Sequence, residues 1–139
     1  MDFLLYISTP VGKTELDPLK TPLTLTAGRL VGGFIYFPRG PAGKLHFIAK
    51  IGEHQILPFN TGQNYRLNGA TASFHLGIDL YHPPFKIDCL TWNDSTSLAH
   101  ICNVVFFLEP SKKLRSLKNA VNSLFNSTQG YEKKSIRKP

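Results

Sequence analysis

The stretch ATASFHLGIDLY (residues 70–81) alternates between apolar and polar residues more regularly than any other part of the chain. Its apolar positions are Ala70, Ala72, Phe74, Leu76, Ile78 and Leu80. Successive side chains of a β-strand point to opposite faces, so a period of two places this apolar set on one side. The alternation therefore predicts a β-strand with one buried face.

The same period recurs on both sides of this stretch. In GKLHFIAKI (43–51), Leu45, Phe47, Ala49 and Ile51 share one predicted face. Further apolar runs, each bounded by Gly, Pro, Asn or Ser, are PLTLT (22–26), LVGGFIYF (30–37), EHQILPF (53–59), PFKIDCLTW (84–92) and HICNVVFFL (100–108). About seven or eight short strands at this spacing are typical of an antiparallel sandwich or barrel. We predict an all-β antiparallel sandwich of jelly-roll or Greek-key type, with a barrel as the alternative.

The length and the composition indicate one domain. The chain has 139 residues, of which 42% are hydrophobic, enough for one core and too few for two. We predict an N-terminal strand or arm over residues 1–21, in which 8–22 (STPVGKTELDPLKTP) are irregular, and a β-sandwich domain over residues 22–110.

The loop FPRGPAGK (37–44) ends in the Gly-Lys pair that also ends a phosphate-binding loop. Such a loop needs a Ser or Thr after the lysine and a helix after that, whereas Leu45 and a predicted strand follow here. Its prolines and glycines instead predict a loop that joins two paired strands.

The periodicity changes after Pro110. We predict an amphipathic helix over residues 111–126 and a disordered basic tail over 127–139. Residues 1–110 hold eight basic and eight acidic side chains, whereas residues 111–139 hold eight basic and one acidic, so the whole net charge of +7 lies in the tail. This asymmetry predicts an acidic or phosphate-bearing partner for the tail.

The predicted helix carries the candidate partner-binding residues. Its apolar stripe consists of Leu114, Leu117, Val121, Leu124 and Phe125. The cations beside the stripe are Lys112, Lys113, Arg115 and Lys118. We expect the stripe to pack in a partner's groove and the cations to contact acidic groups around it.

No catalytic or metal-binding motif occurs in the sequence, and we predict no cofactor and no enzymatic activity. His75 and Asp79 share one face of a predicted strand, but four residues along a strand span ~13 Å, too far for one metal ion. A hairpin through residues 93–99 would place Cys89 opposite Cys102, within reach of a disulfide. Without a secretory signal we expect both thiols to be reduced and packed in the core. A cysteine nucleophile paired with His100 is the less favoured alternative.

The succession of FPRGPAG (37–43), EHQILPFN (53–60), PPF (83–85) and WND (92–94) with His100 resembles small β-sandwich proteins of tailed phages and related viruses. The resemblance covers residues 20–108 and supplies no catalytic residues. It implies a virion accessory role, in capsid decoration or in a tail or fibre, among other assembly proteins and in a homo-oligomer.

The sequence leaves two other functions open. A carbohydrate-binding or host-recognition module would use aromatics such as Tyr36, Tyr65, Tyr81 or Trp92. Alternatively, residues 111–139 could bind nucleic acid or an anionic membrane through their charge. The N-terminus lacks the basic region of a signal peptide and no segment reaches the ~18 apolar residues of a transmembrane helix, so we expect no secretion by that route. The location that the resemblance implies is a virion assembled in the host cytoplasm.

Overall fold

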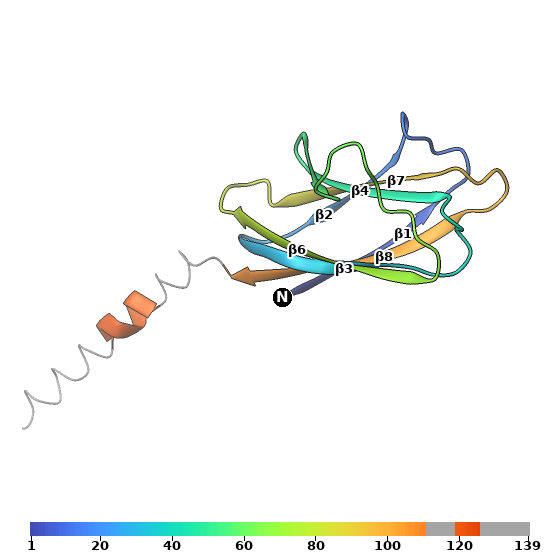
Figure 1. Ribbon diagram of the computed structural model, residues 1–139. Helices are drawn as coiled ribbons and strands as arrows, with labels where there is room; N and C mark the ends of the chain where they lie inside the picture. Colours follow the sequence, from blue (N-terminus) through green and yellow to red (C-terminus); the bar gives the residue numbers. More distant parts are fainter. Residues whose placement is uncertain (111–118, 126–139) are drawn as a thin grey trace, which may run out of the picture.

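The protein is a sandwich of two four-stranded antiparallel sheets (Figure 1), seen in a computed structural model that describes residues 1–110 and 119–125. The eight strands are β1 (Asp2–Thr9), β2 (Leu19–Thr24), β3 (Gly28–Phe37), β4 (Leu45–Ile51), β5 (His54–Leu57), β6 (Ala70–Leu80), β7 (Lys86–Asn93) and β8 (His100–Pro110). Sheet A has the order β1-β8-β3-β6, and sheet B has the order β2-β7-β4-β5. The predicted all-β sandwich is confirmed.

The strand pairing follows one simple rule. β1 pairs with β8, β2 with β7, β3 with β6 and β4 with β5, as if one long hairpin had been rolled up. The pairs β3–β8 and β4–β7 then complete the two sheets. This is the jelly-roll arrangement, in which nearly every connection crosses from one sheet to the other. Only β4 and β5 are neighbours both in the chain and in a sheet.

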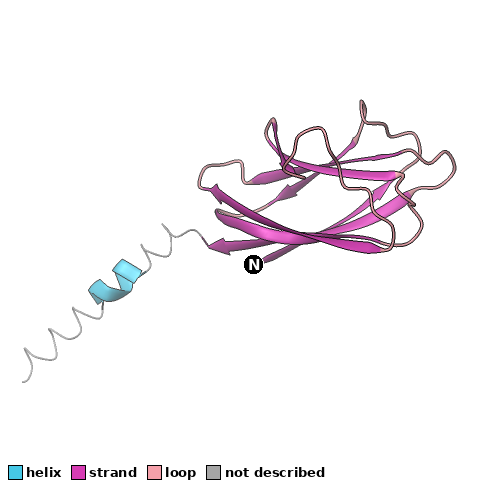
Figure 2. Cartoon of the chain, in the orientation of Figure 1, coloured by secondary structure: helices cyan, strands magenta, loops and turns pink. Residues whose placement is uncertain are grey.

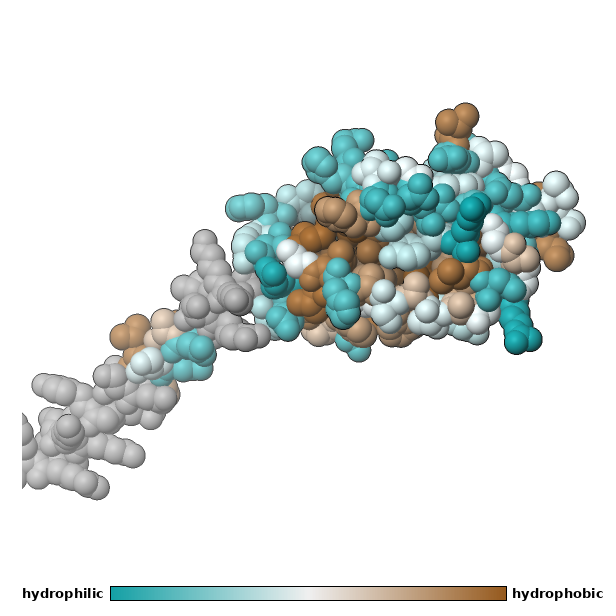
Figure 3. Space-filling view, in the orientation of Figure 1, coloured by the Kyte–Doolittle hydropathy of each residue, from teal (hydrophilic) through white to brown (hydrophobic). Residues whose placement is uncertain are grey.

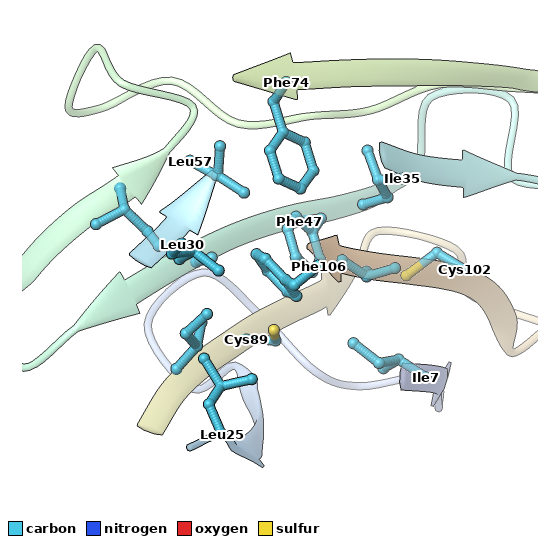
Figure 4. Close-up of a cluster of buried hydrophobic side chains, with 14 of the residues drawn as sticks. Ile7, Leu25, Leu30, Ile35, Phe47, Leu57, Phe74, Cys89, Cys102 and Phe106 are labelled. Atoms are coloured by element: carbon cyan, nitrogen blue, oxygen red, sulfur yellow. The ribbon is translucent and has the colours of Figure 1, made fainter. Parts of the chain in front are cut away.

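The core lies between the sheets and is built from the residues that alternation predicts. Phe74 and Leu80 of β6 and Leu45 and Phe47 of β4 are buried, and Leu76 and Ile78 of β6 are half-buried. Figure 4 shows Phe47, Phe74 and Phe106 meeting at the centre, where the rings of Phe74 and Phe106 lie 5.5 Å apart between centroids. Burial of these aromatic side chains supplies much of the driving force for folding.

The N-terminal strand or arm predicted over residues 1–21 contains two strands, and the second of them begins inside the stretch 8–22 that was predicted to be irregular. Residues 2–9 form β1, an edge strand of sheet A, and the backbone of Leu19–Thr24 pairs with β7 as an edge strand of sheet B. Pro22 obscured β2 in the sequence, but an edge strand tolerates proline because one side of its backbone needs no partner. The sandwich therefore spans residues 2–110 and not 22–110.

The loop FPRGPAGK is a crossing and not a hairpin turn. It leaves β3 in sheet A and enters β4 in sheet B, so the two strands that it joins are not paired. A residue outside the loop holds its backbone in place. The side-chain Oδ1 of Asn68 accepts hydrogen bonds from the backbone amides of Gly40 (2.8 Å) and Ala42 (3.2 Å). The prediction of a loop is correct, and the prediction that it joins paired strands is wrong.

The sandwich is open along the edge between β5 and β6. Ile56, Leu76 and Ile78 line a notch there, and Phe59 beside it is 91% exposed. Figure 3 shows apolar residues gathered in the middle of the visible face, between the two layers, with polar residues along the upper rim.

Residues 119–125 form the one helical segment of the described chain, coloured cyan in Figure 2. It falls within the predicted helix of residues 111–126. The remainder of that prediction, and the predicted disordered tail of residues 127–139, lie outside the described residues.

Candidate functional site

The outer face of sheet A carries apolar and aromatic side chains where the surface of a sandwich is usually polar. We call this set the apolar face. It consists of Leu4 and Tyr6 of β1, Phe34 and Tyr36 of β3, and Val105 and Phe107 of β8.

The register of the strands brings these side chains together from distant parts of the chain. Leu4, Val105 and Phe34 lie opposite one another on β1, β8 and β3, and form one row across the sheet. Tyr6 and Tyr36 flank Asn103 in the next row. Side chains in adjacent positions on one sheet face touch, so the two rows make one continuous surface.

The apolar face is exposed to solvent. Leu4 is 68% exposed, Tyr6 59%, Tyr36 41% and Phe107 36%. The rings of Phe34 and Phe107 pack edge to face, with centroids 6.2 Å apart. A contiguous aromatic surface that remains in water marks an interaction site more often than a single exposed apolar residue does.

The centre of the apolar face is free of charged side chains. The two rows end on β6 at Ser73 and Thr71, and none of the described residues in them is Asp, Glu, Lys or Arg. Charges stand at the margins: Asp2 on β1 lies opposite Phe107, and the Arg29 guanidinium donates a hydrogen bond to the carboxylate of Asp79 at 3.0 Å. An uncharged centre with a polar rim is the usual composition of a protein–protein interface.

The sequence contains a signal for this face that alternation alone misses. In FLLYI (3–7) and VVFFL (104–108) apolar residues occupy both the odd and the even positions. A strand with one solvent-exposed face alternates between apolar and polar residues instead. Continuous apolar runs are typical of strands that are covered on both sides. The two runs pair with each other in sheet A.

The structure brings few of the predicted partner-binding residues into view. Val121 and Phe125, each 62% exposed, and Leu124, 69% exposed, lie on the helical segment of residues 119–125. The other predicted residues are Leu114, Leu117, Lys112, Lys113, Arg115 and Lys118, which lie outside the described residues. The predicted role of the tail stays a prediction.

His46 is the most constrained polar side chain on the outer face of sheet B. It is 6% exposed, and its ring stacks on the indole of Trp92 with centroids 5.0 Å apart and an interplanar angle of 3°. Nδ1 lies 2.6 Å from Oδ1 of Asn64, and Nε2 lies 2.6 Å from Oδ2 of Asp94. These three partners tie the loop after β5 and the end of β7 to the start of β4.

This geometry suits a structural role better than catalysis. A histidine that acts as a general base needs one ring nitrogen free to reach a substrate. Here both ring nitrogens already have a hydrogen-bonding partner, so His46 holds two loops together.

Cys89 and Cys102 are free thiols in the core, and the predicted hairpin between them is wrong. Cys89 lies on β7 in sheet B and Cys102 on β8 in sheet A, since the chain crosses between the sheets after Asn93. Figure 4 shows both sulfur atoms inside the core. Burial raises the pKa of Cys102 to about 12, and burial, together with the nearby Cys102, raises the pKa of Cys89 to about 12.

We expect these thiols to be inert in the folded protein. With a pKa of about 12 instead of about 9, the thiolate fraction at pH 8 falls by about three orders of magnitude. Ellman's reagent should detect no thiol in the native chain and both thiols in guanidinium chloride. Rapid labelling of the native chain would contradict the buried positions, and it would reopen the nucleophilic role for Cys102 beside His100.

The described residues contain no cluster of His, Cys, Asp or Glu that could hold a metal ion. Within the same part of the chain, no helix is long and apolar enough to cross a membrane. In comparisons with protein families and with curated proteins, no family model and no curated sequence matches this chain.

Proposed function

We propose that this chain is a non-enzymatic structural subunit that assembles with copies of itself through the apolar face. The observation that carries the proposal is the uncharged, exposed aromatic surface on sheet A. Jelly rolls include both viral capsid domains and lectin domains, so the fold alone assigns no function. The virion accessory role is the form of assembly that the resemblance of the sequence implies.

A second copy of the chain fits the apolar face for reasons of charge and symmetry. Most homo-oligomers use the same patch on both subunits, which must then be compatible with itself. A patch centred on charges would meet its own copy with repulsion, whereas the rows through Leu4 and Tyr6 hold no charged side chain. Polar residues at the ends of the rows, Ser73 and Thr71, can form the rim.

The exposed apolar area of the apolar face agrees with the area expected for the centre of such an interface. The exposed fractions of its leucine and aromatic residues correspond to an apolar area on the order of 400 Å². A standard interface buries about 800 Å² of each partner, of which the fully buried centre is the more apolar part. The surrounding polar residues of sheet A would supply the remainder.

The association should depend on the apolar face and be measurable by sedimentation velocity of the full chain. We expect the wild type to dimerise or form a larger oligomer between about 1 µM and about 100 µM. Leu4→Glu should weaken association by about 100-fold or more, because it would bury two carboxylates at a symmetric contact. Leu4 is exposed in the monomer, so the variant should fold normally.

Leu16→Glu is the matched control. Leu16 is 98% exposed, but it lies between β1 and β2 and not on the apolar face, so the same substitution should leave association unchanged. A chain that ends at residue 110 should still associate. A monomeric wild type, equal effects of the two glutamates, or loss of association on removal of residues 111–139 would each overturn the assignment to sheet A.

A further inference from the structure

A groove lies on the outer face of sheet B, on the opposite side of the sandwich from the apolar face. Its volume is about 570 Å³, within the range of about 300–1,000 Å³ that is typical of small-ligand sites. Ile48, Leu90 and Trp92 from β4 and β7 line it. The loop after β1 contributes Glu15, and the loop after β5 contributes Gln63.

The apolar part of the groove is rigid. Ile48 is 9% exposed and Trp92 5%, and the indole is fixed by its stacking on His46. His46 also lies 2.6 Å from Asn64, which lines the groove, so the wall and the floor are connected. A preformed site of this kind loses little conformational entropy when a ligand binds.

Several of the polar side chains around the groove have no hydrogen-bonding or ion-pair partner within the described part of the chain. Lys50, Glu53 and Gln63 line the groove, and among the described residues their side chains take part in no hydrogen bond or ion pair. The side chain of Glu15 also lines the groove and likewise takes part in no hydrogen bond or ion pair among the described residues. By contrast, the side chain of Gln55 donates to the carbonyls of Pro58 (2.9 Å) and Gln63 (3.0 Å), and so it is occupied in holding the loop.

These groups together define the chemistry of a ligand. Glu15 and Glu53 can only accept hydrogen bonds when ionised, Lys50 can only donate, and the amide of Gln63 does both. A ligand that satisfies all of them needs many hydroxyl groups, each of which donates and accepts. The two carboxylates disfavour an anionic ligand, and Lys50 offsets one of their charges, which weakens the attraction for a cationic ligand. Leu90, the half-buried residue of the apolar floor, can contact the C–H face of a sugar ring.

We propose that this groove binds a short neutral saccharide. The proposal is independent of self-assembly, because sheet A and sheet B present opposite faces of the sandwich. Of the aromatic residues that the sequence offers for carbohydrate binding, only Trp92 lines the groove. Tyr36 lies on the apolar face, Tyr65 packs against Phe47 and Tyr81 follows β6.

NMR titration of the full ¹⁵N-labelled chain tests the proposal. Trp92 is the sole tryptophan in the sequence, so its indole N–H gives one unambiguous signal. The neutral probes are glucose, galactose, N-acetylglucosamine and maltose, each added to about 50 mM. We expect at least one of them to shift this signal and the amide signal of Gln63 in a saturable way, with a Kd of millimolar order. Glucuronate and glucosamine serve as the charged probes and should bind more weakly.

Matched variants locate the effect. Glu53→Gln and Gln63→Ala change exposed side chains and should raise the Kd at least ~10-fold without changing thermal stability. Glu109→Gln is the control, because Glu109 is exposed on β8 in sheet A and should not affect the Kd. The proposal is overturned if none of the four neutral saccharides shifts the Trp92 indole, if only a charged probe does, or if Glu109→Gln weakens binding as much as Glu53→Gln.

Discussion

Replacement of Gly33 with alanine should lower the free energy of unfolding by more than ~4 kcal/mol, or leave no folded chain. Gly33 lies on β3 between β8 and β6, and a Cβ atom there would stand 1.8 Å from the carbonyl oxygen of Val105 on β8. That oxygen belongs to the backbone of a central strand and cannot move without breaking the pairing of sheet A. The φ angle of +157° adds strain for any residue other than glycine.

Gly77→Ala is the control for this prediction. Gly77 is also in sheet A, on β6, but an added Cβ would meet only the end of the flexible Arg29 side chain, at 2.9 Å. We expect the free energy of unfolding, measured by urea denaturation, to change by less than ~1 kcal/mol. If the two alanine variants were equally stable, the close approach of β3 and β8 at Gly33 would be wrong.

Gly33 also shows which features of β3 the sequence predicts and which it does not. The apolar run LVGGFIYF predicts a strand, because periodicity depends only on residues near in the sequence. The pairing register shifts between Leu30 and Gly32: against β8 the extra residue is on β3, whereas against β6 the extra residue is on β6. Two adjacent glycines inside a strand are typical of such a bulge, but their partner at Val105 lies far away in the sequence. The apolar pattern therefore predicts the strand β3, but it does not predict the partner strands of β3 or their register.

The pairing errors have the same origin. The sequence predicts hairpin loops at FPRGPAGK after β3 and at residues 93–99 after Trp92, and both segments cross between the sheets. Paired strands are about 5 Å apart and packed sheets about 10 Å apart, and a loop of this length spans either distance. The choice is made by the partners that the ends of the strands find elsewhere, which no local pattern contains.

The apolar face and the groove differ in how much of them the sequence reveals. The double-sided apolar runs in β1 and β8 indicate a covered face, although the contribution of Phe34 and Tyr36 depends on β3 lying beside β8. The groove combines Glu15, Gln63 and Trp92 from three separate segments. Only the folded backbone brings those segments together, so no motif predicts the groove.

Asn93 joins the two sheets at the crossing after β7. Its side chain is 4% exposed, and Nδ2 donates hydrogen bonds to the carbonyls of Thr9 (3.2 Å) and Leu98 (2.8 Å). Oδ1 accepts a hydrogen bond from the amide of Ser95 at 2.9 Å. One amide group thus links the end of β1 in sheet A, the end of β7 in sheet B and the segment between β7 and β8.

Asn93→Ala should lower the free energy of unfolding by about 3–5 kcal/mol, because it leaves two carbonyls and one amide without their partner in a mostly buried position. Asn93→Asp should be almost as destabilising, since an ionised carboxylate still accepts from Ser95 but cannot donate to Thr9 or Leu98. Asn60→Ala, at an exposed side chain in the loop after β5, should change stability by less than ~0.5 kcal/mol in the same urea titration. If Asn93→Asp were as stable as the wild type, the two donated bonds would contribute little. The crossing would then depend on its other contacts, such as the bond between the buried hydroxyls of Thr9 and Thr91 at 2.7 Å.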